Sequence, residues 1–145
     1  MLKQRYAFFC GKRHALFGRN GLKLADLKSE NFVSFTSDQI GGNLSPLTIF
    51  RDQQGFTGRI VASSSSLDEI RRLVAAGYGI GCLPEHVVAK DVQAGEVWRL
   101  PPAEGVIDVN VYLLWNRDQK RTHAEAVFLG RFEQALLATE VSNRF

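Results

Sequence analysis

The stretch SSSSLDEIRRLVAAGYGIGCLP, residues 63–84, decides how the rest of the chain is interpreted. Ser66 is a favourable N-cap, and Glu69 three residues later completes the pattern of a capping box. Apolar residues then recur at helical spacing, at Leu67, Ile70, Leu73 and Val74. Gly77 stands where a left-handed C-terminal cap is needed. These signals predict a helix that begins after Ser66 and ends before Gly77.

A buried strand is predicted directly after this helix. Residues 80–83 are Ile-Gly-Cys-Leu, a short apolar run, and Pro84 ends it. Because the run is apolar on both faces, we expect it to lie inside a sheet and to pair in parallel. The whole stretch is therefore interpreted as a helix that leads into a parallel strand.

The rest of the chain repeats this alternation of strands and helices. Strands are predicted at residues 6–10, 32–35, 59–62 and 109–115, with a brief extended piece at 97–100. Helices are predicted from Pro46 to the residue before Gly55, and at 85–94 and 122–138, with a turn or short helix at 22–27. This order predicts an α/β domain with a mainly parallel sheet flanked by helices.

Length, composition and charge restrict the function classes. A chain of 145 residues suits one domain, and 45% hydrophobic with 23% charged residues is usual for a soluble globular protein. The net charge of +3 comes from scattered basic residues, which disfavours a nucleic-acid groove. No apolar run reaches membrane-spanning length and no signal peptide is recognisable, so we expect a cytoplasmic protein without membrane contact.

The cysteines and histidines favour neither a metal site nor catalysis. Cys10 and Cys82 are far apart and lack a C-x-x-C pattern, so we expect buried free thiols in a reducing compartment. His14, His86 and His123 fall in three separate elements, without a second ligand at metal-binding spacing. The sequence also lacks a nucleophile elbow and a phosphate-binding loop. We therefore expect no enzyme, no metal and no cofactor.

Two helix starts instead favour the binding of a small molecule. The polar loop 36–43 leads into the helix that begins at Pro46, and the serine run 63–66 leads into the next helix. The first turn of a helix offers backbone N–H groups and a positive dipole end, which suit a small carboxylate. In an open parallel sheet, ligands bind beyond the carboxyl ends of the strands, where both loops would lie. The alternative is that Ser45 and Ser66 are only helix caps.

An ordered set of motifs extends this interpretation to a family. The set is FFCGKRH at 8–14 with LF at 16–17, LADL at 24–27, FVSF at 32–35, GF at 55–56, SLDEI at 66–70, VAAGYGIGCLP at 74–84 and VYLLW at 111–115. In these motifs the sequence resembles the effector-binding region of LysR-type transcriptional regulators, from about Tyr6 to Leu137.

The resemblance implies a fold like that of the type 2 periplasmic binding proteins, in which two α/β lobes are joined by two crossing strands around a ligand cleft. It implies that residues 6–10 are the first hinge strand, 32–100 the second lobe, 109–115 the return hinge strand and 122–138 the C-terminal helix of lobe one. Residues 1–145 would then be a partial effector-binding domain. The winged helix-turn-helix, the linker helix and the first part of lobe one are missing from the pattern, so we expect a fragment of a longer regulator or a truncated product. Ala15 also stands where the family usually has proline.

The resemblance further implies which residues contact the effector. It places them after the second strand and in the loop that follows, in the loop after the first hinge strand and at the end of the return strand. Together with the helix start at Ser66, the candidates are His14, Phe35, Thr36, Ser37, Gly41, Gly42, Ser66 and Trp115. For His14 the alternative is an exposed loop histidine, and for Trp115 it is a core residue of the hinge.

The function implied is that of a bacterial sensor, which binds a small organic effector, a carboxylate or an aromatic compound, and so modulates a DNA-bound oligomer. DNA would be contacted only through a domain absent from this chain. Because half of the cleft is missing, we expect weak or lost effector affinity, and we expect helix 122–138 to cover its apolar face by dimerising or swapping between chains. A stand-alone binding module, or an enzyme on the same fold, remains an alternative.

Overall fold

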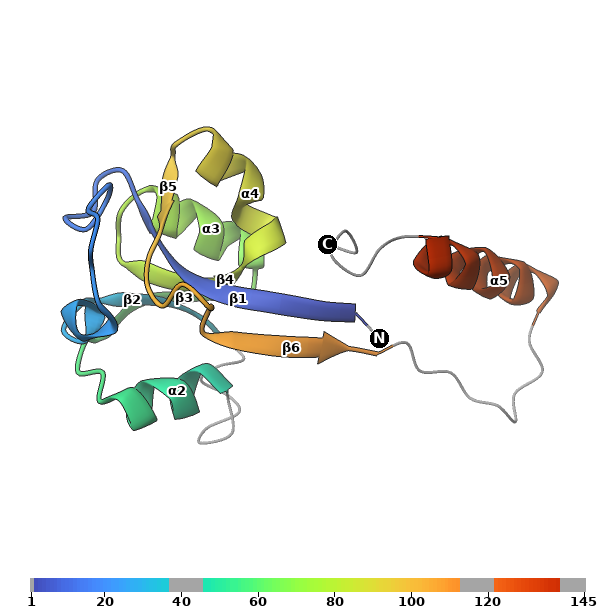
Figure 1. Ribbon diagram of the computed structural model, residues 1–145, viewed down its shortest axis with the longest axis horizontal. Coiled ribbons are helices and arrows are strands. Elements are labelled where there is room, and N and C mark those ends of the chain that lie inside the picture. The colour runs from blue at the N-terminus through green and yellow to red at the C-terminus, as the bar shows by residue number, and fades with distance from the viewer. Residues whose placement is uncertain (1, 37–45, 113–121, 139–145) are drawn as a thin grey trace. The chain divides into compact units, whose positions relative to one another are not determined.

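The computed structural model describes residues 2–36, 46–112 and 122–138 of the chain. Its elements follow in the order β1 (Leu2–Gly11), η1 (Leu24–Leu27), β2 (Phe32–Phe35), α2 (Pro46–Gln54), β3 (Ile60–Ser64), α3 (Leu67–Ala75), β4 (Ile80–Pro84), α4 (Glu85–Gln93), β5 (Val97–Arg99), β6 (Ile107–Val111) and α5 (His123–Ala138) (Figure 1). The chain divides into two compact units, Arg5–Val109, which we call the large unit, and Met1–Gln4 with Asn110–Phe145. Within the described ranges, no helix combines the length and apolar character that crossing a bilayer requires.

The strands form one mixed six-stranded sheet. Its order is β3-β2-β4-β1-β5, and β6 pairs with β1. Strand β2 is parallel to β3 and to β4, which agrees with the parallel pairing predicted from the alternation of strands and helices. Strand β1 is antiparallel to both β4 and β5. The sheet is therefore mixed. Its parallel pairings lie among β2, β3 and β4, whereas β1, which lies outside the repeating strand–helix units, runs in the opposite direction.

Two apolar clusters cover the opposite faces of this sheet. Successive side chains of a strand point to opposite faces, so Ala7 and Phe9 of β1 enter one cluster while Phe8 and Cys10 enter the other. The first cluster includes the buried residues of α3 and α4, and residues of η1 and α2 pack in the second. Figure 1 shows α3 and α4 on one side of the sheet and α2 on the other. The large unit is therefore a sheet between two helical layers.

Residues 63–84 form the helix and the strand that were predicted, although β4 is parallel only to β2 and is antiparallel to β1. Helix α3 ends in a two-bond C-cap in which the N–H of Tyr78 donates to the carbonyl of Leu73 at 3.2 Å and the N–H of Gly77 donates to Val74 at 2.9 Å. This turn requires a positive φ, and Gly77 adopts +85°. Strand β4 follows and is buried at both ends. The local signals were sufficient here.

The two cysteines are free thiols, as predicted. Cys10 is buried and Cys82 is partly buried. Burial of Cys10, with a smaller contribution from the carboxylate of Glu30, raises the pKa of its thiol to about 12. A thiol with this pKa stays protonated at neutral pH, so Cys10 acts as a small apolar core residue.

Helix α5 belongs to the smaller unit and has a complete N-terminal capping box. The N–H of Thr122 donates to the Glu125 carboxylate at 2.7 Å, and the N–H of Glu125 donates to the Thr122 hydroxyl at 3.3 Å. The rings of Phe128 and Phe132 stack at 5.9 Å between centroids. Phe128 is nevertheless 63% exposed and Leu137 is 83% exposed, so the helix leaves large apolar side chains in water.

Candidate functional site

The carboxyl ends of β2 and β3 lie next to each other, at what we call the carboxyl edge of the sheet. Phe35 of β2 is in register with Ser64 of β3. The N–H of Thr36 donates to the carbonyl of Ser64 at 2.8 Å, which fixes the first residue after β2 against the end of β3. Phe35 is half-buried and packs against the core cluster of α3 and α4. The edge therefore has the half-buried Phe35 side chain in register with Ser64, and the backbone of Thr36 is fixed against the end of β3.

A hydrogen-bonded network ties this edge to the start of α3. The Ser66 hydroxyl accepts from the N–H of Glu69 at 3.4 Å, so Ser66 is the N-cap that the sequence predicted. The Ser66 N–H donates to the Ser64 hydroxyl at 3.0 Å, and that hydroxyl in turn donates to the Glu69 carboxylate. The predicted capping box is thus closed through Ser64 instead of by a direct bond from Ser66 to the Glu69 side chain. The serine run 63–66 indicated a hydrogen-bonded helix start, but the sequence alone does not show that Ser64 links Ser66 to Glu69.

This network changes what the start of α3 can bind. Two acidic residues, Asp68 and Glu69, occupy the first turn and face the positive end of the helix dipole. A hydrogen bond from Arg71, together with the charge of Arg72, holds the pKa of the Asp68 carboxyl below its usual value, so Asp68 is ionised at neutral pH. From the sequence, the first turn of this helix was predicted to bind a ligand carboxylate. The chain's own hydroxyls and carboxylates fill that role, which favours the alternative that Ser66 is a cap.

Both strands that link the two units pass the same edge of the sheet. Tyr6 of β1 is in register with Pro84, the last residue of β4. The N–H of Val106 donates to the carbonyl of Tyr6 at 2.7 Å, and the Arg5 guanidinium lies 3.7 Å from the Asp108 carboxylate. The chain thus enters and leaves the large unit at the edge that carries Thr36 and Ser66.

His14 lies at the opposite edge of the sheet and is not brought together with the other candidates. It follows the end of β1, and its Nε2 is 3.5 Å from the carboxylate of Glu30, just before β2 begins. Its Nδ1 accepts a hydrogen bond from the N–H of Leu16 at 3.3 Å, and the side chain is only 9% exposed. Because β2 has four residues, about 13 Å of strand separates the two edges. His14 is a nearly buried loop residue paired with Glu30, unlike the exposed loop histidine that was its alternative.

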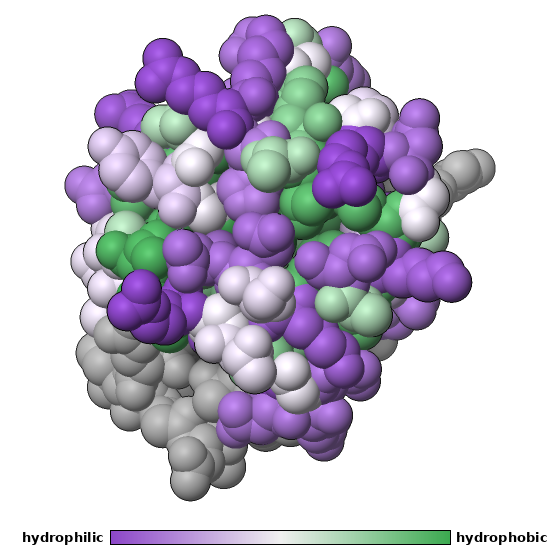
Figure 2. Space-filling view, turned by 90° about the vertical axis from the view of Figure 1, so that its left-hand side faces the viewer, coloured by the Kyte–Doolittle hydropathy of each residue, from purple (hydrophilic) through white to green (hydrophobic). Residues whose placement is uncertain are grey.

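The loops at His14's edge belong to a mainly polar surface. Figure 2 looks at the side of the molecule where the loop after β1 and η1 lie, and it shows hydrophilic residues interrupted by smaller apolar areas. The described residues on this side therefore show no broad apolar area of the kind that a large docking surface has.

Four of the predicted effector contacts lie outside the described residues. They are Ser37, Gly41, Gly42 and Trp115. Among the residues that the structure does describe, no three His, Cys, Asp or Glu side chains gather as metal ligands would.

Comparison with known proteins decides the family. The family model of the LysR substrate binding domain matches residues 1–137 of this chain. The chain belongs to the LysR substrate binding domain family. The α/β fold with flanking helices is therefore that of a LysR effector-binding domain, and the ordered motifs in the sequence identified it correctly.

Individual proteins are also similar to this chain in sequence or in fold. A Bacillus subtilis (strain 168) protein described as the uncharacterized HTH-type transcriptional regulator YwbI is 28% identical over 116 residues, which cover 80% of this chain and 38% of that protein. The apo regulatory domain of HypT from Salmonella typhimurium has a TM-score of 0.69 at 16% identity, covering 95% of this chain and 64% of that one. The effector binding domain of QuiR in complex with shikimate has a TM-score of 0.68 at 18% identity, covering 92% and 63%. The LysR-family chain thus spans less than two thirds of each of these proteins.

Proposed function

We propose that this chain is the effector-sensing part of a bacterial LysR-type transcriptional regulator, and that it binds a small organic molecule at the carboxyl edge. The observation that carries the proposal is the juxtaposition of Phe35, Thr36 and Ser64 at the ends of two adjacent parallel strands. Ligands in open α/β sheets bind at such ends. The similar fold of a domain described in complex with shikimate supports a ligand of this size. Because the named relatives are regulators, we propose a binding role without catalysis.

The carboxyl edge favours particular groups on that ligand. Phe35 offers an aromatic contact, and the Thr36 hydroxyl can both donate and accept. Asp68 is compensated by ion pairs with Arg71 and Arg72, both at 2.8 Å. The Glu69 carboxylate at the start of α3 is therefore the group that disfavours a ligand carboxylate and can accept a hydrogen bond from a ligand hydroxyl. We therefore propose a hydroxylated organic acid or aromatic compound whose hydroxyl groups face α3. The family pattern adds Ser37, Gly41, Gly42 and Trp115 as further proposed contacts.

We propose that binding acts on DNA by shifting an equilibrium between arrangements of lobes and subunits. A ligand changes such an equilibrium only by as much as its affinities for the two arrangements differ. DNA would be contacted by a helix-turn-helix domain like the one that gives the Bacillus relative its name. The direction of the response, activation or repression, follows from which arrangement the ligand prefers.

Thr36→Val is the variant that tests the carboxyl edge. We expect shikimate, or another hydroxylated acid from a panel, to shift the amide NMR signals of Thr36 and Ser64, and we expect Thr36→Val to weaken that binding about tenfold. The valine keeps the shape of threonine but removes one hydrogen bond to the ligand. Thr57→Val is the matched control, because the Thr57 hydroxyl bonds to the Lys28 carbonyl at 3.3 Å before β3 begins. Equal effects of the two variants, or a panel that leaves both amide signals unmoved, would contradict the proposed site.

We also propose that this chain associates with a second copy through the apolar residues of α5. Phe128 and Leu137 are large apolar side chains of this helix that are 63% and 83% exposed. Sedimentation velocity should show a dimer that grows with concentration, and Phe128→Gln should shift the equilibrium toward the monomer. Tyr78→Gln, at a side chain 64% exposed in the large unit, should leave the equilibrium unchanged. A wild-type chain that stays monomeric at the highest concentration would refute this association.

A further inference from the structure

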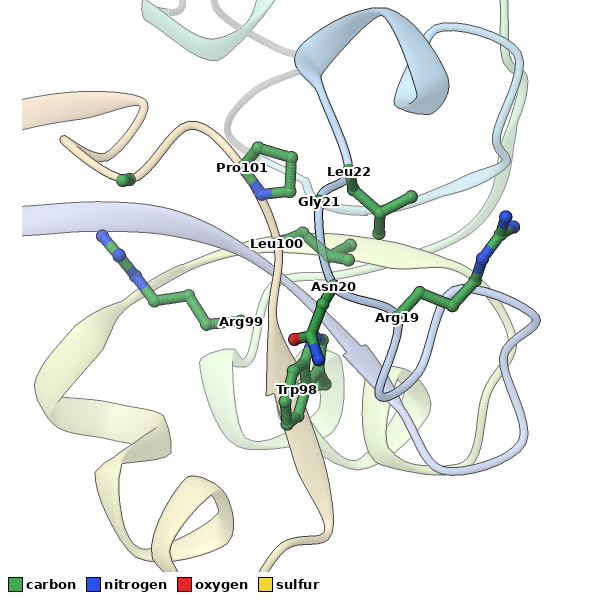
Figure 3. Close-up of a pocket in the computed structure, with 9 residues that line it drawn as sticks. Arg19, Asn20, Gly21, Leu22, Trp98, Arg99, Leu100 and Pro101 are labelled. Atoms are coloured by element: carbon green, nitrogen blue, oxygen red, sulfur yellow. The ribbon is translucent and has the colours of Figure 1, made fainter.

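An open cavity of about 310 Å³ lies at the surface of the large unit, between the loop that ends at Leu22 and the end of β5 with the segment that follows it (Figure 3). The two walls come from parts of the sequence that are far apart. The residues that line it are Arg19, Asn20, Gly21, Leu22, Trp98, Arg99, Leu100, Pro101 and Ala103. This volume is within the range of small-molecule sites.

The interior of the cavity suits a flat ring. Figure 3 shows Leu22, Leu100 and Pro101 on one side and Trp98 below them, with the amide of Asn20 directed toward the indole. The Trp98 ring is held in place by Phe17, at 5.9 Å between centroids. The half-buried Trp98 ring and the exposed Asn20 amide are the groups that can bind and orient a small ring compound here, since Leu100 is only 2% exposed.

Two arginines, Arg19 and Arg99, flank the cavity, and they differ in whether their charge is compensated. The Arg99 guanidinium donates to the Glu85 carboxylate at 2.6 Å, so its charge is compensated. Arg19 is exposed, and it forms no ion pair with any residue in the described ranges. Figure 3 shows the two guanidinium groups extending to opposite sides, with their aliphatic stems at the cavity. An exposed, uncompensated arginine can turn its guanidinium toward an anion at this mouth.

The cavity is separate from the carboxyl edge. In the sheet order, β5 lies three positions from β2, so about 14 Å separates the two strands. A ligand of the cavity therefore does not touch Thr36 or Ser64, and it occupies a second site.

We propose that this cavity binds a flat, single-ring organic monoanion, with the ring against Trp98 and the carboxylate on the guanidinium of Arg19. The Asn20 amide donates the second hydrogen bond to the carboxylate. Such a ligand is a second input to the large unit, independent of a molecule bound at the carboxyl edge.

Phenylacetate is the probe, and its neutral amide phenylacetamide is the matched ligand control. Titration of the 145-residue chain with phenylacetate should shift the NMR signals of the Trp98 indole N–H and the Asn20 side-chain amide in a saturable way. Phenylacetamide should bind about tenfold more weakly, because it lacks the charge that Arg19 recognises. Equal affinity for both probes would overturn the assignment of Arg19. Absence of saturable shifts at Trp98 and Asn20 would overturn the site.

Variants separate a specific contact from the general charge of the protein. Arg19→Gln should weaken phenylacetate binding about tenfold, whereas Arg59→Gln, which removes the same charge from an exposed position before β3, should change it by less than about twofold. Equal weakening by both variants would show non-specific attraction and would overturn the proposal. Phenylacetate shifts confined to Thr36 and Ser64 would also overturn it, while leaving the proposed carboxyl-edge site intact.

Discussion

Replacing Phe8 with alanine is expected to lower the free energy of unfolding of the large unit by about 3–5 kcal/mol. The Phe8 side chain is fully buried, and its ring lies between three others: Phe32 at 5.6 Å, Phe56 at 5.8 Å and Phe50 at 5.9 Å. Alanine at this position removes the buried apolar area of the ring and leaves a cavity. The other three rings belong to β2, α2 and the loop after α2, and they cannot all move to fill it. Urea denaturation followed by far-UV circular dichroism measures the change.

Two further variants make this test quantitative. Phe8→Leu keeps most of the volume and should cost about 1–2 kcal/mol, so it stays folded even where the alanine variant does not. Phe17→Ala is the matched aromatic control, because Phe17 is only partly buried and its ring contact is with Trp98. We expect it to cost less than half as much as Phe8→Ala. A Phe8→Ala variant as stable as Phe17→Ala would mean that the four rings do not form the packed cluster described here.

The elements that were predicted well from sequence carry their signals locally. Residues 63–84 include a cap, an apolar stripe, a left-handed stop and a buried strand within one short segment, and α3 and β4 form there. Strand β1 was predicted only from residue 6, although it starts at Leu2. Its first residues, Leu2 to Arg5, are largely polar, so no apolar run marks them as a strand. Their strand conformation depends on pairing with β6, about a hundred residues later, which no local pattern reveals.

The candidate site could be predicted in part, for a related reason. Thr36 and Ser66 were expected to lie close together because both follow parallel strands. In the structure both donate a backbone N–H to Ser64, Thr36 to its carbonyl and Ser66 to its hydroxyl, so they lie at the same edge. His14 was added by family resemblance, and its position depends on the direction of β1. Because β1 is antiparallel to β4, the end of β1 lies beside the start of β4 and not beside its end. Strand direction is a property of the assembled sheet and cannot be taken from the residues near His14.

The cavity beside Trp98 was not predicted from the sequence. One wall, residues 19–22, is an irregular loop, and the other, residues 98–103, is the end of β5 with the segment that follows it. They meet because β1 brings Gly11 into register with Val97, which sets the loop after β1 beside β5. Convergence of this kind depends on sheet register, so only the folded chain shows it.

Gly11→Ala is the second substitution with a large expected effect, about 3 kcal/mol or more of lost stability. A Cβ atom added at Gly11 would overlap the backbone carbonyl oxygens of Val74 and Ala75, at the C-terminal turn of α3. These carbonyls belong to the turn that Gly77 closes, so the helix end cannot move away without breaking its cap hydrogen bonds. A clash with backbone is costlier than one with a flexible side chain, because no change of rotamer relieves it.

Gly95→Ala separates this clash from the general cost of replacing a glycine. Gly95 has a φ of +68°, and nothing lies within 4 Å of an added Cβ, so alanine there pays only for backbone strain. That strain is about 1–2 kcal/mol. Urea denaturation should therefore rank the chains as wild type, Gly95→Ala and Gly11→Ala in order of falling stability. If Gly11→Ala were as stable as Gly95→Ala, β1 and α3 would not approach as closely as described. The close approach matters for the proposed site because it seats α3 on the sheet, and with α3 the Ser66 and Glu69 network at the carboxyl edge.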